Sequence, residues 1–350
     1  MACRTQAAVF GHQQGHPRNE ALEWTPRLKI FLGWKLRFPA RPDRPGSLCD
    51  LVEPLSYNDP QRGVVAVSNQ AARALRGRRS GVVLLASDPR TASIAAMAAG
   101  MEDAGRERGI AVSITAVGAD AGAHLHALRI LRGLRPLALV IPSASFAGTD
   151  RERILAELQT INREGANVVF IGEQGYDFPA VRFDDDQIGR TVADYMATLG
   201  RHRPAVLTTS GHPALESRVR GFLAGLEAAG YPVDSIAVET SELTRAGGHA
   251  AASRLLRGRE KPDMILAGND LLAIGALQAI IDAGLDVPRD VALSGVDDIP
   301  IARDLTPGLT TVSLPFLQAG REALALALDT TQSGDVHMTC TLVVRGSTRP

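Results

Sequence analysis

From Gly81 onward, short β-branched or aliphatic runs alternate with longer amphipathic or alanine-rich stretches. The short runs have the length of strands, and the longer stretches have the spacing of helices. Strands are predicted at Val82–Ala86, Ala111–Val117, Leu137–Ile141, Val168–Ile171, Ala205–Thr208, Ile236–Thr240, Met264–Ala267 and Val291–Gly295. Helices are predicted between them, at 92–108, 121–133, 150–164, 185–200, 214–229, 245–257, 269–283 and 316–331.

Several predicted helices end at a glycine, which readily adopts the left-handed conformation that closes a helix. These glycines are Gly109, Gly165, Gly200, Gly230 and Gly284. Regular strand–helix alternation favours parallel sheets with right-handed crossovers. Eight such units exceed one comfortable sheet, so we expect an α/β protein with two similar lobes facing a cleft. A closed barrel of eight units is the alternative, but late strand pairs such as Thr310–Leu314 and Thr341–Val344 fit it poorly.

Residues 1–62 differ in kind from the rest of the chain. They contain seven prolines and both tryptophans of the protein, Trp24 and Trp34. Proline interrupts helices, and at this spacing no helical period continues for more than about ten residues. We therefore predict a largely unstructured segment.

The composition is that of an ordinary globular protein, with 350 residues, 45% hydrophobic and 22% charged. The three cysteines form no metal-ligand or disulfide pattern, which suits a reducing compartment. No signal peptide or membrane-spanning run is visible, and we expect a cytoplasmic protein.

The formal net charge of zero conceals an uneven distribution. Residues 1–80 hold 13 Lys and Arg against 6 Asp and Glu, a net +7, whereas the remaining 25 basic and 32 acidic residues give −7. A basic arm on an acidic body is typical of proteins that bind nucleic acid. An arginine-rich coding bias without function would produce the same pattern.

The candidate chemistry lies after the strands of the second half. Arg218 is on the helix after Ala205–Thr208, Asn269 and Asp270 follow Met264–Ala267, and Asp297 follows the strand at 291–295. Open α/β sheets bind ligands at the carboxyl ends of their strands. A bland interpretation exists for each residue: a surface ion pair for Arg218, a helix cap for Asn269 and a turn for Asp297. The pattern favours a binding module over a catalyst.

Enzymatic interpretations find little support, because the chain lacks the G-x-S-x-G, G-x-x-x-x-G-K-[ST] and H-E-x-x-H patterns. The run Asp184–Asp186 resembles a metal cluster, but consecutive residues diverge on a helix, and acidic residues at a helix start favour capping. We therefore predict no catalytic residues, no metal and no cofactor.

Seven further motifs stand in a fixed order around these residues. They are Asn69-Gln-Ala-Ala-Arg-Ala-Leu-Arg76, Phe183-Asp-Asp-Asp-Gln-Ile-Gly189, Leu199-Gly-Arg-His-Arg-Pro204, Arg218-Val-Arg-Gly-Phe222, Ala283-Gly-Leu-Asp-Val-Pro288, Pro307-Gly-Leu-Thr-Thr311 and Leu342-Val-Val-Arg-Gly-Ser-Thr348. In this order and spacing, the chain from Asn69 to Thr348 resembles the lac-repressor (LacI/GalR) family of bacterial transcription regulators.

The resemblance implies two Rossmann-like lobes of the periplasmic-binding-protein-like type I fold. Residues 80–181 with 313–335 would form the first lobe, and 182–312 with 336–350 the second. Residues 67–79 would form a hinge helix, and 1–66 an irregular segment. A small effector would bind between the lobes of a homodimer.

The resemblance also implies the DNA contacts. Asn69, Arg73 and Leu75 match the family's hinge, whose leucine bends DNA as an apolar wedge in the minor groove. The helix-turn-helix that precedes the hinge in the family is not readable in residues 1–66. We hypothesise that this segment comes from a shifted reading frame or a misplaced start, which puts operator recognition by this chain in doubt.

For the effector, the resemblance assigns Arg218, Asn269 and Asp297, with Glu173 close to an acidic position of the family. Asp270 is assigned to structure. Leu243 stands near a cleft position that is often aromatic, so stacking on a sugar would fall to Phe146, Tyr176 or Phe178. A polyhydroxylated ligand, such as a sugar, is expected.

The function expected is therefore an effector-responsive, repressor-type transcriptional regulator. A solute-binding protein of a transporter shares the fold and is the alternative, as is a sensor that has lost DNA binding.

Overall fold

The computed structural model describes residues 80–86, 88, 91–117, 121–142, 151–172, 175–329 and 334–349. The chain divides into two units, Met1–Asn58 and Asp59–Pro350, and all described residues belong to the second. The predicted irregular segment 1–66 and hinge helix 67–79 lie outside the described residues.

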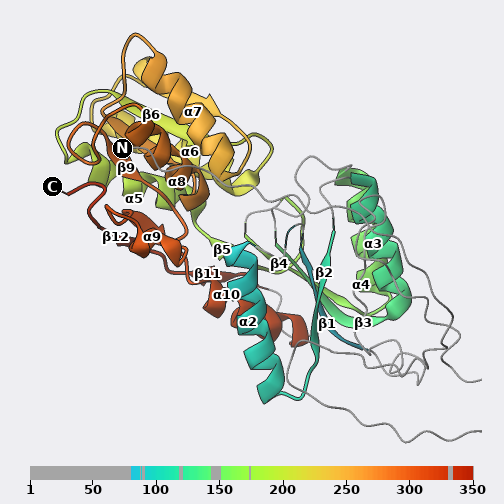
Figure 1. Ribbon diagram of the computed structural model, residues 1–350. Helices are drawn as coiled ribbons and strands as arrows, with labels where there is room; N and C mark the ends of the chain where they lie inside the picture. Colours follow the sequence, from blue (N-terminus) through green and yellow to red (C-terminus); the bar gives the residue numbers. More distant parts are fainter. Residues whose placement is uncertain are drawn as a thin grey trace, which may run out of the picture. The chain divides into compact units, whose positions relative to one another are not determined.

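The first sheet is parallel and has the strand order β11-β5-β4-β3-β1-β2. Its strands are β1 (Ser80–Ala86), β2 (Val112–Ala116), β3 (Pro136–Pro142), β4 (Asn167–Ile171), β5 (Ala180–Phe183) and β11 (Val336–Met338). Its helices are α2 (Ala92–Glu107), α3 (Ala121–Leu134), α4 (Arg151–Arg163) and α10 (Phe316–Leu328). Figure 1 shows α3 and α4 on one face of this sheet and α2 and α10 on the other.

Side-chain alternation along β1 explains this layering. Val82 and Leu84 point into the core shared with α2 and α10, whereas Val83 and Leu85 point into the core shared with α3 and α4. A strand covered on both faces has no polar side, and it therefore appears in the sequence as a continuous apolar run.

The second sheet is also parallel, with the order β7-β6-β8-β9. Its strands are β6 (Pro204–Thr208), β7 (Ala237–Thr240), β8 (Met264–Ala267) and β9 (Ala292–Ser294). Its helices are α5 (Asp185–Ala197), α6 (Pro213–Ala228), α7 (Arg245–Arg257) and α8 (Asp270–Asp282), with the short η3 (Val233–Ser235) and α9 (Ile301–Asp304) in connections. A third, antiparallel pair joins β10 (Thr311–Ser313) to β12 (Thr341–Val343).

The prediction of two open sheets is confirmed, and the barrel alternative is wrong because neither sheet closes on itself. All five glycines predicted to end helices have positive φ, between 66° and 92°. The remaining differences are short elements that the hydrophobic pattern did not reveal.

The predicted lobe boundaries differ from the observed sheets at one edge. Residues 182–183 and 336–338 were assigned to the second lobe, but β5 and β11 pair in the first sheet. Asp335 fixes this pairing: its carboxylate accepts hydrogen bonds from the backbone N–H of Ala180 (3.0 Å) and from Nε of Arg182. A three-residue strand held by one carboxylate leaves no periodic signal.

Three helix pairs pack closely enough to require glycine on both partners. An ideal Cβ on Gly221 would lie 2.0 Å from the carbonyl oxygen of Asp186, and one on Gly189 would lie 2.2 Å from that of Arg218. The same reciprocal arrangement joins α2 to α10 through Gly100 and Gly320, and α7 to α8 through Gly248 and Gly275.

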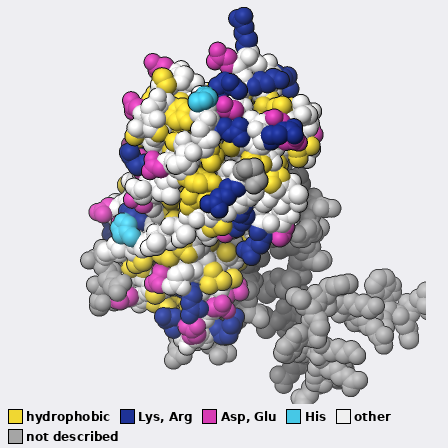
Figure 2. All heavy atoms as spheres, turned by 90° about the vertical axis from the view of Figure 1, so that its left-hand side faces the viewer, with side chains coloured by type: hydrophobic (Ala, Val, Ile, Leu, Met, Phe, Trp, Pro, Cys, Tyr) yellow, Lys and Arg dark blue, Asp and Glu magenta, His cyan; other side chains and the backbone are white. Residues whose placement is uncertain are grey.

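The surface is of mixed charge. Figure 2 shows acidic and basic side chains intermixed over the face it presents, with apolar side chains between them. In the described part of the chain, no helix is both long and apolar enough to span a membrane.

Candidate functional site

A cavity of about 860 Å³ opens at the carboxyl ends of the strands of both sheets. Asp88 and Thr91 follow β1, Gly172 follows β4, and Asn269 follows β8. In the second sheet β6 lies between β7 and β8, so the strand order reverses beside β6. Ligands of open α/β proteins bind at this kind of reversal, and the cavity lies where the sequence predicts a ligand.

Arg218 lies at the centre of the cavity's polar side, on α6, and only 5% of its surface is exposed. Its Nε donates to Asp185 Oδ1 at 2.7 Å. Its Nη1 donates to the carbonyl oxygen of Gly268 at 2.9 Å and to Asp297 Oδ1 at 3.2 Å. A surface ion pair is therefore the wrong interpretation for Arg218. None of these three bonds uses Nη2, which leaves donors for a ligand.

Asp297 has a backbone conformation that is rare for a residue with a side chain, with φ of 120°. Its N–H donates to the carbonyl oxygen of Val312, in β10, at 2.9 Å. Burial raises the pKa of Asp297 to about 6, although Arg218 lowers it. Strain held in place by surrounding bonds is characteristic of ligand sites, and Asp297 lines the cavity.

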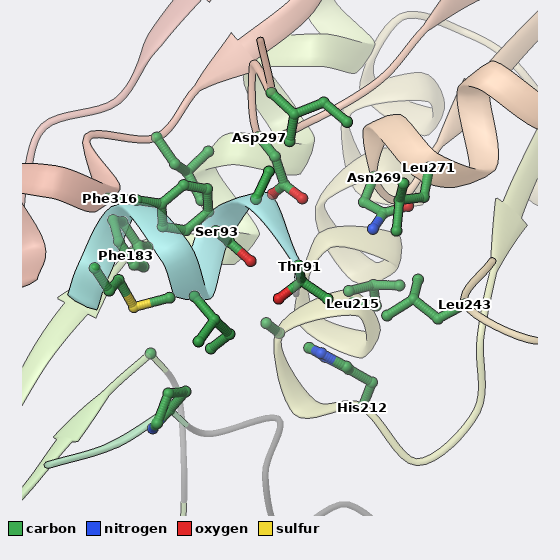
Figure 3. Close-up of a pocket in the computed structure, with 18 of the residues that line it drawn as sticks. Thr91, Ser93, Phe183, His212, Leu215, Leu243, Asn269, Leu271, Asp297 and Phe316 are labelled. Carbon is green, nitrogen blue, oxygen red and sulfur yellow. The ribbon is translucent and has the colours of Figure 1, made fainter. Parts of the chain in front are cut away.

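Asn269 is both a helix cap and a cavity residue. Its side-chain oxygen accepts from the N–H of Leu272 at 3.0 Å, which caps α8. Figure 3 shows its amide nitrogen on the cavity side, and Thr91, Ser93 and Asp297 also line the cavity. The interpretation of Asn269 as a helix cap is thus correct for its side-chain oxygen, and its amide nitrogen is left available to a ligand.

The three aspartates of the 184–186 run have three different roles. Asp184 caps α5 by accepting from the N–H of Gln187, as predicted. Asp186 pairs with Arg190 at 2.7 Å on the surface. Asp185 is buried and holds Arg218, so the prediction that capping explains the whole run is wrong for this residue. Helix geometry, which separates consecutive side chains by about 100°, directs Asp185 inward.

Asp270 is fully buried and has a structural role, as predicted. Its Oδ1 accepts from the hydroxyl of Thr311 at 2.7 Å and its Oδ2 accepts from the N–H of Ile299 at 2.9 Å. Burial, together with the nearby Asp297, raises the pKa of Asp270 to about 8, against the effect of these hydrogen bonds.

A pH dependence of stability follows from Asp270. In the unfolded chain its pKa returns to about 3.9, so the folded state binds this proton more tightly. The resulting stabilisation is fully present below pH 4 and is lost as the pH rises through 8. Between pH 5 and pH 8, the free energy of unfolding should fall by about 2–4 kcal/mol more in the unsubstituted protein than in Asp270→Asn. Urea denaturation of both proteins across this range is the measurement; parallel curves would contradict it.

The aromatic residues of the cavity are not those expected. Tyr176 and Phe178 pack on Phe170, with ring centroids 5.6 and 6.0 Å away, and do not line this cavity. The lining aromatics are Phe183 and Phe316, whose ring centroids lie 5.6 Å apart edge to face. Tyr176 and Phe178 follow β4 but pack into the core on the face of the first sheet that α3 and α4 cover.

His212 is a cavity residue that sequence reasoning did not identify. It precedes α6, and burial together with the neighbouring Arg218 lowers its pKa to about 4. The imidazole is therefore neutral at pH 7. Its Nδ1 is buried and has no hydrogen-bond partner among the described residues. No local pattern in the sequence marks this position, because its neighbours come from distant segments.

Two of the predicted effector contacts, Glu173 and Phe146, lie outside the described residues, as do the hinge residues Asn69, Arg73 and Leu75. Leu243 lines the cavity, as expected for its position. Within the described part of the chain, no group of three or more His, Cys, Asp or Glu side chains is arranged to hold a metal ion.

Two open parallel sheets with a polar cavity at their carboxyl ends are the arrangement of the periplasmic-binding-protein-like fold. A family model described as a periplasmic binding protein-like domain matches residues 193–348. A crystal structure of a LacI-family transcriptional regulator from Enterococcus faecium, with bound ribose, has a TM-score of 0.68 and 21% identity, and covers 77% of this chain and 98% of that one.

The curated relatives are transcription regulators. The HTH-type transcriptional repressor CytR of Escherichia coli is 31% identical over 49% of this chain and 52% of its own length. The ribose operon repressor of the same organism is 32% identical over 47% of this chain and 52% of its own length. Over this half of its length, the chain is similar to these repressors of the lac-repressor (LacI) type. It spans about half the length of the curated relatives it matches.

Proposed function

We propose that this chain is the effector-sensing part of a transcriptional repressor. It binds a small polyhydroxylated ligand, a sugar or sugar derivative, in the cavity around Arg218, Asn269 and Asp297. The observation that carries the proposal is the convergence of one buried guanidinium, one strained carboxylate and one amide at the ends of the strands. A fork of donors beside a carboxylate acceptor suits adjacent hydroxyl groups, which both donate and accept.

The relatives support both parts of this proposal. Two of them carry the name of a repressor, and the solved neighbour was crystallised with ribose. These names are those of regulators and not of enzymes. A solute-binding protein of a transporter would have the same fold, but none of these three relatives carries such a name. The proposal includes a homodimer and operator DNA as partners.

The test is calorimetric titration of the whole chain against a panel of neutral sugars, polyols and glycosides. At least one member should bind saturably, with one ligand per chain, and raise the thermal midpoint. A panel in which no member saturates the protein at millimolar concentration would show that the cavity is not a carbohydrate-type site.

A separate prediction concerns DNA. Residues 1–80 carry +7, but no recognition helix is readable in them. We expect nonspecific DNA affinity at most, strongly weakened by salt, with the log-affinity slope steepening by about 0.9 per phosphate neutralised. Fluorescence anisotropy with an operator-like palindrome and a scrambled duplex over a salt series measures this. Nanomolar binding confined to the palindrome would show that residues 1–66 recognise sequence.

A further inference from the structure

The cavity is larger than one sugar ring requires. Its volume of about 860 Å³ lies near the upper end of the range of pockets that enclose drug-sized ligands. The polar groups that suit hydroxyls, Arg218, Asn269 and Asp297, occupy only one side of it. A second part of the ligand would therefore contact what lines the remainder.

Three leucines form an apolar wall beside these polar groups. Leu215 is buried in the first turn of α6, and Leu243 and Leu271 pack partly exposed on the same core. All three line the cavity, and Figure 3 shows them together on the side of Asn269. Hydroxyl groups placed against this wall would lose water without gaining a partner, which is unfavourable for each buried group. The wall therefore favours an apolar face and disfavours a second sugar.

His212 adds a polar position at the edge of the leucine wall. Figure 3 shows its ring beside Leu215 and Leu243. Its Nδ1 is buried and without a hydrogen-bond partner among the described residues, and a buried polar atom is costly unless a ligand or water satisfies it. A neutral imidazole can donate or accept, and it suits a heteroatom on the rim of a flat ring.

The positive charge on the polar side is already compensated. Asp185 and Asp297 both pair with Arg218, so two carboxylates surround one guanidinium and this group has no excess positive charge for an anion. A phosphate or carboxylate placed there would face two carboxylates at close range. This side of the cavity therefore favours neutral groups of a ligand.

We propose that the ligand is a neutral glycoside whose aglycone is a flat ring with a polar edge. Its hydroxyls meet Arg218, Asn269 and Asp297. The ring lies against Leu243 and Leu271, and its heteroatom meets His212. Nucleosides and aryl glycosides share this chemistry. The proposal rests on the proposed function, because it names the ligand class of that same cavity.

The experiment compares matched ligands by calorimetry on the whole chain. The probes are ribose, adenosine, cytidine and adenosine 5′-monophosphate, with glucose and phenyl β-glucoside as the second set. At least one glycoside should bind at least tenfold more tightly than its parent sugar. Adenosine 5′-monophosphate should bind more weakly than adenosine. Binding of the nucleosides alone would identify the ring as a nucleobase, and binding of the phenyl glucoside alone would identify it as an aryl group.

The alternative results separate the two proposals. If a free sugar binds as tightly as its glycosides, the inference is wrong and the sugar-sensing function stands. Tighter binding of the monophosphate than of adenosine also overturns it. If no probe binds, the inference fails, and the wider panel of sugars, polyols and glycosides decides the proposed function.

Variants test the position of the ring. Leu271→Ser should weaken the glycoside about tenfold and change free-sugar affinity less than twofold. Ile281→Ser is the matched control, because Ile281 lies on the same helix, is 51% exposed and does not line the cavity. Leu243→Ser gives a second measurement outside the helix, in case Leu271→Ser fails to fold. If Leu271→Ser and Leu243→Ser both lose as much affinity for the free sugar as for the glycoside, the leucine wall does not contact the ring and the inference is wrong.

Discussion

Arg218→Ala should lower the free energy of unfolding by about 3–5 kcal/mol, because the substitution leaves two buried carboxylates without their cation. Asp185 loses its partner at 2.7 Å and Asp297 loses its partner at 3.2 Å. The carbonyl oxygen of Gly268 also loses a donor. Urea denaturation monitored by circular dichroism gives the free energy directly.

Arg220→Ala is the matched control on the same helix. Arg220 is exposed, and its hydrogen bond runs to the hydroxyl of Ser217 at 2.7 Å. Its replacement should change stability by less than about 0.5 kcal/mol. Similar losses for the two variants would mean that the pairing of Arg218 with Asp185 and Asp297 contributes little.

Asp297→Asn separates ligand binding from folding. Asparagine has nearly the same size and, like aspartate, tolerates positive φ better than most residues. The neutral amide should still accept from Arg218 but lose the charged acceptor for a ligand hydroxyl, which lowers effector affinity at least tenfold. Unchanged affinity in a folded Asp297→Asn protein would show that the carboxylate does not contact the ligand.

The second large effect is expected at the contact between α5 and α6. Gly221→Ala should destabilise the protein by about 3 kcal/mol, toward the upper end of what overpacking costs. Its new methyl group would lie 2.0 Å from the carbonyl oxygen of Asp186 and 2.9 Å from the backbone nitrogen of Arg190. Both atoms are backbone, so the two helices must separate to make room.

Gly133→Ala serves as the comparison for Gly221→Ala. Gly133 lies in α3 with nothing within 4 Å of the position of a Cβ. Alanine is the better helix former, so this variant should be neutral or more stable by up to about 1 kcal/mol. A Gly221→Ala protein as stable as Gly133→Ala would mean that the two helices can separate at little cost.

Much of the fold could be predicted because the signals are local. The apolar runs of buried strands and the left-handed glycines after the helices gave elements whose bounds agree with the structure within a few residues. The strands β5 and β11 were missed because four- and three-residue segments have no measurable period. Their position depends on Asp335, which lies some 150 residues away from β5.

The polar side of the cavity could also be anticipated, since Arg218, Asn269 and Asp297 each occupy a fixed place after a strand. The remaining lining could not. Phe183, Phe316 and His212 come from three separate segments and meet only in the folded chain. Nor could the sequence distinguish Asp185 from Asp184 and Asp186, because only the packing of α5 on α6 determines which of the three faces inward.

The path of the chain through the first lobe has a consequence for the order of folding. Its helix α2 packs on α10, and its edge strand β5 pairs with β11, so residues 92–107 and 180–183 need partners that are synthesised only after residue 315. By contrast, α5 with α6 and α7 with α8 are neighbours in sequence. Contacts between distant segments form slowly, because a long loop must close first. During synthesis, the second lobe should therefore acquire most of its packing early, whereas the first lobe should expose the apolar faces of α2 and β1 until α10 emerges from the ribosome.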